Sequence, residues 1–300
     1  MKYDICVFGG CSLDIMHYAD GSMSIVPGGK GSNQAVAASR AGSKVAIITK
    51  LGDDEHGLSI MKNLKDNGVD ISNILYNKEV KNDICDITIS ENGDNDIKRQ
   101  NGAIDSFTPD MVEMFKDVIL DSKVVIMQFK APKEVSEALI DFCHKNNKPI
   151  VLTPCRPKKL DITNPKDVDL LNKVSIITCN EEECKTIFKT DDIISCVTKY
   201  PNKLIVTLGA KGLVYFNGTE VVYKPAIEIE QSKVIDTTGA GDTLNGNLVS
   251  ALCKGYTFDE AIERAMYSST MKIQMKTAQA GMPTEEELNN YIDKTNNKRL

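Results

Sequence analysis

The sequence lacks the features of a secreted or membrane-embedded protein. It has no cationic N-terminus followed by an apolar stretch, and no apolar run reaches the roughly 18 residues that a membrane-spanning helix needs. Its 36 basic and 42 acidic residues give a net charge of −6, with both signs spread along the chain. A basic surface for nucleic acid or anionic lipid is therefore not expected. We expect a cytoplasmic protein that has neither nucleic acid nor membrane as a partner.

Spacings typical of a disulfide framework or a zinc site are also missing. The nine cysteines are scattered without a C-x-x-C pair, and the three histidines show no metal-type spacing. We interpret the cysteines as reduced, partly buried thiols, because most lie in apolar runs. A cysteine nucleophile stays open as an alternative, with His17, His56 or His144 as its partner.

No repeat, low-complexity tract or Pro/Ser-rich linker divides the chain, so residues 1–300 are predicted to form a single domain. Short β-branched runs alternate with longer amphipathic ones. This alternation predicts an α/β fold whose mostly parallel sheet is covered by helices on both faces. The expected strands are Asp4–Phe8, Lys44–Thr49, Lys123–Phe129, Pro149–Leu152, Val174–Thr178 and Leu204–Thr207. The expected helices are Gly31–Ala41, His56–Asn67, Pro109–Lys116, Lys133–Asn146, Glu181–Phe188, Ala240–Lys254, Asp259–Ile273 and Thr284–Tyr291.

Two stretches interrupt this rhythm. Residues Tyr18–Val26 are short, polar and turn-like. Residues Ile84–Ile89 and Asp96–Arg99 flank the turn signal Glu91–Asp94, which predicts a hairpin. We expect a small β excursion outside the main sheet, such as a lid, with segments near 15–27 and 80–103.

The segment Ile235–Thr243 is the most informative part of the chain. An apolar approach leads into the four residues Gly239, Ala240, Gly241 and Asp242, and a helical pattern follows. Small residues leave backbone N–H groups unobstructed at a helix N-terminus, where an anion is favoured. A carboxylate beside such an anion site is suited to phosphoryl transfer to an alcohol. The alternative is an ordinary glycine-rich turn with a capping aspartate.

Two earlier motifs carry groups suited to a small polar molecule. In Val26–Ala37, three glycines precede an alanine-rich helix, while Lys30 and Asn33 supply side-chain donors. The glycine spacing fits neither a dinucleotide fingerprint nor a Walker A motif. In Phe8–Asp14, the carboxylate of Asp14 follows the first expected strand and could accept hydrogen bonds from two hydroxyls. A helix or turn cap is the alternative for this aspartate.

Two later motifs also follow expected strands. Asn180 suits a helix N-cap, and Glu183 could hold a water in the shell of Mg²⁺. The glycine-containing loop Gly209–Gly212 follows the strand Leu204–Thr207 and is either a turn or the border of a nucleotide. Ligands of mostly parallel sheets bind at the carboxyl ends of the strands. The motifs therefore predict a shared ligand site at that edge.

Taken in order along the chain, the five motifs resemble the ribokinase-like (PfkB) carbohydrate kinase family. The resemblance extends from Asp4 to about Pro283, and its most specific parts are Gly28–Ala38 and Asp236–Asn245. It implies a Rossmann-like sheet with a small β lid. It also implies ATP as phosphoryl donor, Mg²⁺ as its partner, and phosphorylation of a hydroxymethyl group of a sugar or sugar derivative.

The resemblance also implies roles for individual residues. By position, Asp242 is the catalytic base, and Gly239, Ala240 and Gly241 form the anion hole. The sugar side consists of Ser12, Asp14, Gly28, Gly29, Lys30, Asn33 and Lys130. The nucleotide side consists of Asn180, Thr207, Leu208, Gly209, Ala210, Lys211, Gly212 and Gly241. Glu183 falls on the metal motif, and Asp236 and Thr238 fall where ribokinases hold a monovalent cation such as K⁺.

The sequence departs from ribokinases at several of these places. Ser12 stands where they commonly carry Asn, Met266 replaces a polar residue beside the adenine, and Gly281 lacks the hydroxyl of a cation ligand. The segment between Asp14 and Gly28 is roughly a dozen residues shorter, which removes much of the first lid strand. These departures argue against a strict K⁺ requirement and a lid-mediated homodimer, although a homodimer stays open.

Lys130 is the departure that bears on the substrate. It stands where ribokinases have a sugar-binding Glu, so an acceptor of hydrogen bonds is replaced by a donor. We expect plain ribose to be a poor substrate, and a substrate with a carboxylate, a phosphate or an extra acceptor to gain a contact. The alternative is a solvated surface lysine.

The leading hypothesis is an ATP-dependent sugar kinase. A nucleoside kinase of the same family is the first alternative. A non-catalytic sugar or nucleotide sensor on the kinase fold is the second, and the intact Asp242 argues against it because a sensor needs no base.

Overall fold

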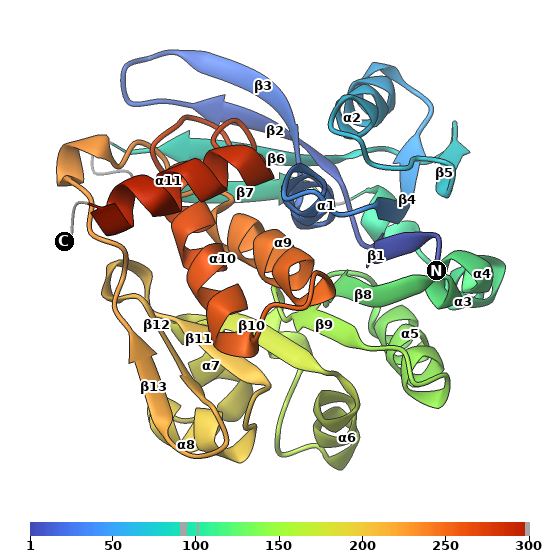
Figure 1. Ribbon diagram of the computed structural model, residues 1–300. Coiled ribbons are helices and arrows are strands. Elements are labelled where there is room, and N and C mark those ends of the chain that lie inside the picture. The colour runs from blue at the N-terminus through green and yellow to red at the C-terminus, as the bar shows by residue number, and fades with distance from the viewer. Residues whose placement is uncertain (91–94, 101, 298–300) are drawn as a thin grey trace.

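A computed structural model describes residues 1–90, 95–100 and 102–297 of the chain. Its main sheet consists of β1 (Tyr3–Phe8), β4 (Val45–Gly52), β5 (Ile74–Asn77), β8 (Ser122–Gln128), β9 (Ile150–Thr153), β10 (Ile176–Asn180), β11 (Leu204–Thr207), β12 (Leu213–Phe216) and β13 (Val221–Lys224). Their spatial order is β13-β12-β11-β10-β9-β8-β1-β4-β5 (Figure 1). Neighbours from β5 to β11 are parallel, whereas β12 and β13 return antiparallel. The predicted mostly parallel sheet is confirmed.

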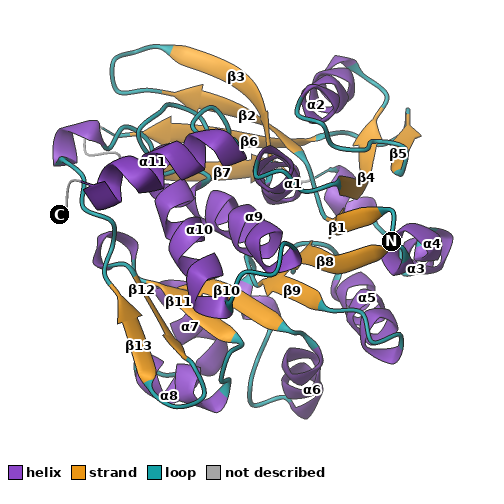
Figure 2. Cartoon of the chain, viewed as in Figure 1, coloured by secondary structure: helices purple, strands orange, loops and turns teal. Residues whose placement is uncertain are grey.

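Helices cover both faces of this sheet (Figure 2). The central strand β1 explains why, since Ile5 and Val7 face one core and Cys6 and Phe8 face the other. The first core contains α1 (Lys30–Arg40), α2 (Glu55–Asp66), α9 (Ala240–Cys253) and α10 (Phe258–Lys272), with α11 (Glu285–Asn297) beside α10. The second contains α3 (Asp110–Met114), α4 (Lys116–Leu120), α5 (Lys133–Lys145), α6 (Pro165–Lys173), α7 (Glu181–Phe188) and α8 (Ile193–Lys199).

The six expected strands all exist, and their observed ends differ from the expected ones by at most a few residues. The sequence prediction missed the four-residue strands β5, β12 and β13, and the helices α6 and α8. Strands β5 and β13 are the two edge strands of the sheet and are only partly buried, so they lack the largely buried apolar run that predicted the equally short β9 and β11. The expected helix over 109–116 is wrong as one element, because α3 ends before Phe115 and α4 begins after it.

A second sheet lies against one edge of the first (Figure 1). It contains β2 (Ser12–His17), β3 (Met23–Gly28), β6 (Asp83–Ile89) and β7 (Asn95–Gln100) in the order β3-β2-β6-β7. The predicted hairpin is confirmed by the antiparallel pairing of β6 with β7, while its turn at 91–94 lies outside the described residues.

The turn expected over 18–26 is confined to 18–22, and residues 23–26 belong to strand β3 of the expected β excursion. The expectation of a largely missing first lid strand is wrong. Strands β2 and β3 pair antiparallel over six positions, from Ser12 opposite Gly28 to His17 opposite Met23. The buried side of β2, through Met16, packs on apolar residues of β6. The outer side of β3 leaves Met23 and Ile25 exposed, and the strand ends in Pro27 and Gly28, which are depleted in strands and weaken its signature in the sequence.

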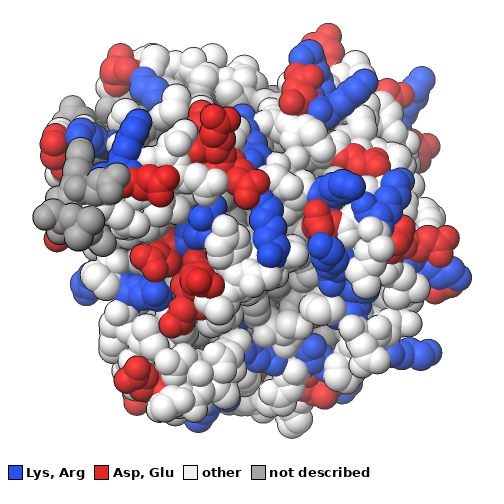
Figure 3. All heavy atoms as spheres, in the orientation of Figure 1, with Lys and Arg blue, Asp and Glu red and all other residues white. Residues whose placement is uncertain are grey.

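Acidic and basic side chains are interspersed on the face seen in Figure 3. Within the described part of the chain, no helix combines the length and the apolar character that crossing a membrane requires.

Candidate active site

The candidate site is built around the first turn of α9. Gly239 precedes this helix with φ +80°, a left-handed conformation that favours glycine. A Cβ on Gly239 would also lie 2.5 Å from the carbonyl oxygen of Ala278, so the turn and the following loop touch through backbone. Gly241, by contrast, has nothing within 4 Å of an added Cβ. Open space therefore borders Gly241 at the start of α9, where an anion would be favoured, while the N–H of Ala240 donates to the carbonyl oxygen of Thr237 at 3.2 Å.

Asp242 is held in place by two amides of α1. Its side chain is 5% exposed. Its Oδ2 accepts a hydrogen bond from Asn33 Nδ2 at 3.0 Å, and its Oδ1 accepts one from Gln34 Nε2 at 2.9 Å. Two neutral donors satisfy a buried carboxylate and fix its orientation without a counter-charge of their own. The carboxylate remains an acceptor beside the open space at Gly241.

Close packing of α1 on α9 makes these contacts possible. A Cβ on Gly246 of α9 would lie 2.5 Å from the Cβ of Ala37 and 2.9 Å from the carbonyl oxygen of Gln34. Only a glycine at this position lets the two helices approach so closely. The side chains of Asn33 and Gln34 then reach the first turn of the neighbouring helix.

A network of buried polar side chains supports the amide of Gln34. Its Oε1 accepts a hydrogen bond from Gln128 Nε2 at 2.8 Å, at the end of β8. Thr153, at the end of β9, accepts one from Asn245 Nδ2 at 2.7 Å and lies 3.4 Å from Gln34 Nε2. The ends of two parallel strands thereby fix the residues that fix Asp242.

Lys30, at the first position of α1, supplies positive charge to the surroundings of Asp242. The carboxylate of Asp242 is the main cause that raises the pKa of the Lys30 ammonium, and Glu183 raises it further. The ammonium is therefore charged and lies near both carboxylates. Because the carboxylates of Asp242 and Glu183 both act on the Lys30 ammonium, the motifs around residues 30, 183 and 242 lie in the same region of the molecule.

Asp14 and Gly28 meet on the neighbouring strands β2 and β3. Ser12 Oγ donates a hydrogen bond to Asp14 Oδ1 at 2.7 Å. A Cβ on Gly28 would overlap the Asp14 carboxylate. A Cβ on Gly29, whose φ is +88°, would overlap the backbone of Cys11 and Ser12. These two glycines are therefore required by close approach. The alternative of a turn or helix cap for Asp14 is wrong, because it lies inside a strand.

Lys130 is buried rather than solvated, so its interpretation as a surface lysine is wrong. Its Nζ lies 3.6 Å from Oδ2 of Asp83, at the start of β6. Asp83 is 1% exposed, and this Oδ2 has no hydrogen-bond partner, while its Oδ1 accepts from the backbone N–H of Gly102. Lys130 also stabilises the charged form of Asp14. The ammonium thus has its counter-charge within the protein.

Asn180 and Glu183 form a reciprocal cap at the start of α7. Asn180 Oδ1 accepts from the N–H of Glu183 at 2.7 Å, and Glu183 Oε2 accepts from the N–H of Asn180 at 3.1 Å. The predicted N-cap is confirmed. On the next strand, Thr207 ends β11 and Leu208 leads into a single 3₁₀ turn. Gly209 there has φ +59° and nothing within 4 Å of an added Cβ.

Asp236 and Thr238 lie beneath the α9 turn. The carboxylate of Asp236 accepts hydrogen bonds from the N–H groups of Thr238 and Thr277, both at 2.8 Å. Its carbonyl oxygen accepts one from the ammonium of Lys272 at 2.7 Å. Lys272 is 0% exposed, and burial lowers its pKa to about 8. A side chain that the sequence interpretation did not consider therefore lies in the expected cation position.

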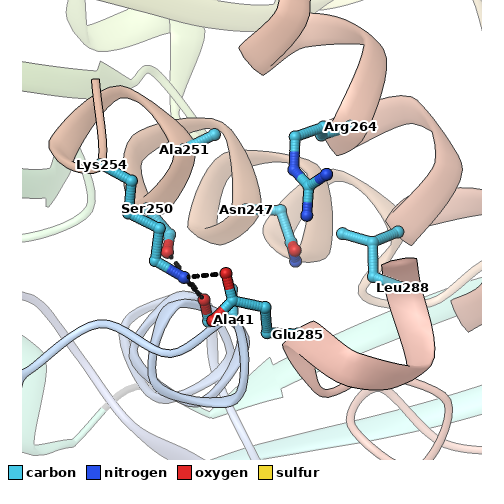
Figure 4. Close-up of a pocket in the computed structure, with 8 residues that line it drawn as sticks. All are labelled: Ala41, Asn247, Ser250, Ala251, Lys254, Arg264, Glu285 and Leu288. Carbon is cyan, nitrogen blue, oxygen red and sulfur yellow. Dashed lines mark hydrogen bonds and ion pairs between the residues drawn. The ribbon is translucent and has the colours of Figure 1, made fainter. Parts of the chain in front are cut away.

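Two hollows lie away from Asp242. A cavity of about 10 Å³ at the junction of α1, α9, α10 and α11 has room for about one water. Lys254 points across it to the carbonyl oxygen of Ala41 and to Glu285, at 2.5 and 2.6 Å (Figure 4). The second, of about 290 Å³, borders Leu208 and Lys211 of the expected nucleotide side.

Comparisons with known proteins identify the family and the fold. The model of the pfkB family of carbohydrate kinases matches residues 2–285. The chain belongs to this family. It is 33% identical to the ribokinase of Bacillus subtilis over 300 residues, which is 96% of this chain and 99% of that one. It is 35% identical to the ribokinase of Lactococcus lactis over 266 residues, covering 88% and 85% of the two chains. The resemblance stated from the motifs is confirmed.

The fold of this pfkB kinase recurs among solved structures. The ribokinase of Arabidopsis thaliana, solved with ribose and ATP, superposes with a TM-score of 0.84 at 22% identity, over 97% of this chain and 99% of that one. The adenosine kinase of Sinorhizobium meliloti superposes with a TM-score of 0.82 at 20% identity, over 95% and 99%. The fold is therefore shared by kinases of different acceptors and does not select one.

Sequence reasoning missed four residues of this site: Gln34, Asp83, Gln128 and Lys272. Gln34 stands directly after Asn33, so the glycine-rich motif could have been read one residue further. Lys272 is a lone lysine at the end of a buried helical stretch, which is a signal in itself. Nothing local marks Asp83 or Gln128, because their partners come from distant segments.

The buried Asp14 predicts that sugar binding by this kinase weakens in acid. Burial raises the pKa of Asp14 to about 6, and only the ionised carboxylate can accept two hydroxyl hydrogen bonds. The acceptor is present above the raised pKa and is lost as the pH falls through it. We expect the sugar Kd to be constant above about pH 7 and to rise about tenfold per pH unit below about pH 5.5. Calorimetric titration of the sugar measures it.

The control is Asp14→Asn, which should bind the sugar weakly and without pH dependence over the same range. A wild-type Kd that stays flat down to about pH 5 would contradict an acceptor role for Asp14.

Proposed function

We propose that this carbohydrate kinase transfers the γ-phosphoryl group of ATP to a hydroxymethyl group of a sugar, with Asp242 as general base. The observation that carries the proposal is the setting of Asp242. Its buried carboxylate is oriented by Asn33 and Gln34 and stands one residue after the open turn Gly239–Gly241. A base and an anion site side by side are what phosphoryl transfer to an alcohol requires.

The proposed reaction is a direct transfer of the phosphoryl group to the sugar hydroxyl. Asp242 accepts the proton of the sugar hydroxyl as the hydroxyl oxygen forms a bond to the γ-phosphorus. The bond between that phosphorus and the bridging oxygen breaks, and ADP leaves with the electron pair. The N–H groups of Gly239 and Gly241, with the Lys30 ammonium, stabilise the negative charge on the transferring group, while the N–H of Ala240 donates to the carbonyl oxygen of Thr237 and holds the turn. After the products are released, Asp242 gives the proton to solvent.

The nucleotide would lie along the ends of β10 and β11. Asn180, the run Thr207–Gly212 and Gly241 border this side, and open space at Gly209 and Gly241 leaves room for phosphates. Glu183 would hold a Mg²⁺ ion there through a water, and its carboxylate also helps to keep the Lys30 ammonium charged. Such an ion would neutralise phosphate charge. The sheet β3-β2-β6-β7, which carries Asp14 and Asp83, would act as the lid over the sugar.

The acceptor that fits best is an uncharged sugar. Asp14 offers a carboxylate acceptor, and Lys130 offers a donor whose charge Asp83 already balances. Relatives of this chain are named ribokinase and, at 26% identity, deoxyribokinase in Salmonella typhi, which favours a pentose. The prediction that ribose itself is used poorly stays open for the same assay. A nucleoside kinase and a non-catalytic sensor are its other outcomes.

The test is ADP release in a panel of pentoses, hexoses, sugar acids, sugar phosphates and nucleosides, with Asp242→Asn as the matched variant. Loss of the general base should lower kcat about 10²–10⁴-fold while nucleotide binding stays near wild type. A variant that keeps more than about a tenth of wild-type kcat would rule out the base role. Turnover of nucleosides alone, or of nothing, would replace the proposal by one of the alternatives.

Gly241→Val tests the anion hole. Position 241 is helical and has open space around an added Cβ, so the variant should fold normally. Its branched side chain would occupy the space meant for the transferring group. We expect kcat to fall about 10²–10³-fold with an unchanged melting temperature. Normal kcat in a folded Gly241→Val protein would show that the turn is only structural.

Asp83→Asn tests the balance of charge around Lys130. The substitution keeps the shape but leaves the ammonium without its counter-charge. We expect the ratio of kcat/KM for a sugar acid over that for the corresponding neutral sugar to rise about tenfold. The control is Asp86→Asn on the same strand, whose exposed carboxylate pairs with His17 and should not change the ratio. An unchanged ratio in Asp83→Asn would contradict charge balance as the cause of selectivity.

A further inference from the structure

Lys272 lies near the α9 turn, and the proposed mechanism leaves its burial unexplained. It is the last residue of α10 and is 0% exposed. Removing an ammonium from water is costly unless it meets opposite charge or hydrogen-bond acceptors. Its Nζ donates to the carbonyl oxygen of Asp236 at 2.7 Å, and the carboxylates of Asp236 and Asp242 both favour its charged form.

The end of α10 is fixed to the α9 turn at a second point. Ser269 Oγ, one helical turn before Lys272, donates to the carbonyl oxygen of Ala240 at 3.0 Å. The N–H groups of Ile235 and Asp236 bond to the carbonyl oxygen of Ile273. The Lys272 ammonium therefore has a fixed position beneath the residues that precede and begin α9. Its charge adds to the positive end of the helix dipole.

A monovalent metal ion does not fit these residues. Such an ion would need a shell of oxygen atoms in place of its water. Here the carbonyl oxygen of Asp236 already accepts from the ammonium, and its carboxylate accepts from two backbone N–H groups. Gly281 has no side-chain oxygen, and even a Cβ there would lie 2.6 Å from the carbonyl oxygen of Lys272. A cation would also be repelled by the ammonium.

We propose that Lys272 is a built-in cation, which positions and charges the anion-binding turn so that the kinase needs neither K⁺ nor Na⁺. The inference rests on the proposed function of that turn. Lys272 does not touch the substrate. It acts through the Asp236 carbonyl as a positioning residue for the N–H groups of Gly239 and Gly241.

The first experiment measures kcat of the wild type with K⁺, Na⁺ or tetramethylammonium as the only monovalent cation, at constant ionic strength. We expect the three values to agree within about twofold. Lys272→Ala should lose about tenfold or more in kcat in tetramethylammonium, with little change in the sugar KM. K⁺ or methylammonium, which are small enough to occupy the vacated space, should restore activity severalfold.

Lys148→Ala is the matched control. Lys148 is also buried, and its ammonium donates to the carbonyl oxygens of Leu120 and Ser122 at the opposite end of β8. Its loss should lower the melting temperature without creating a response of kcat to K⁺. This control separates loss of a buried lysine in general from loss of the charge beneath the turn.

Melting temperatures provide a readout that does not depend on activity. K⁺ should raise the melting temperature of Lys272→Ala relative to tetramethylammonium and leave the wild type unchanged. If Lys272→Ala does not fold, Lys272→Gln serves in its place. A wild type whose kcat or melting temperature requires K⁺ would overturn the proposal, and so would a folded variant that K⁺ and methylammonium leave unchanged. If no acceptor is phosphorylated but K⁺ still changes the melting temperatures as expected, only the proposed function is overturned.

Discussion

The close contact between α1 and α9 is the constraint on which the rest of the site depends. Gly246 lets the helices approach, and Asn33 and Gln34 then reach the carboxylate of Asp242. A buried carboxylate needs such partners, because without them its charge would be neutralised by protonation or exposed to water. The same two amides are neutral, which suits the proposed role of Asp242 as the base that accepts a proton.

Buried charge is balanced within the protein at three places around this contact. Asp83 lies opposite Lys130 on the proposed sugar side. The carboxylates of Asp242 and Glu183 raise the pKa of Lys30. Lys272 donates a hydrogen bond to the carbonyl oxygen of Asp236 beneath the α9 turn. Each lysine provides hydrogen-bond donors or positive charge that a bound ligand or ion would otherwise have to provide. The pattern favours a neutral sugar as acceptor and leaves the triphosphate as the main anion to be bound.

Much of the fold could be predicted because it follows from local periodicity. The alternation of β-branched and amphipathic runs predicted the parallel sheet and the long helices, and the glycine-rich motifs predicted the family that the comparisons confirmed. The edge strands β5 and β13 lack the largely buried apolar run that predicted the equally short β9 and β11. Strand β3 was missed because it ends in Pro27 and Gly28, which are depleted in strands.

The motif at Gly239–Asp242, the N-cap Asn180 and the family could be predicted from residues close together in the sequence. Only the tertiary structure decided that Lys130 is buried against Asp83 and that Lys272 lies in the expected cation position. The physical reason is that local motifs are encoded by residues a few positions apart, whereas the state of a charged side chain depends on its burial and its partners. Those partners lie far away in sequence and meet only when the sheet and its helices pack.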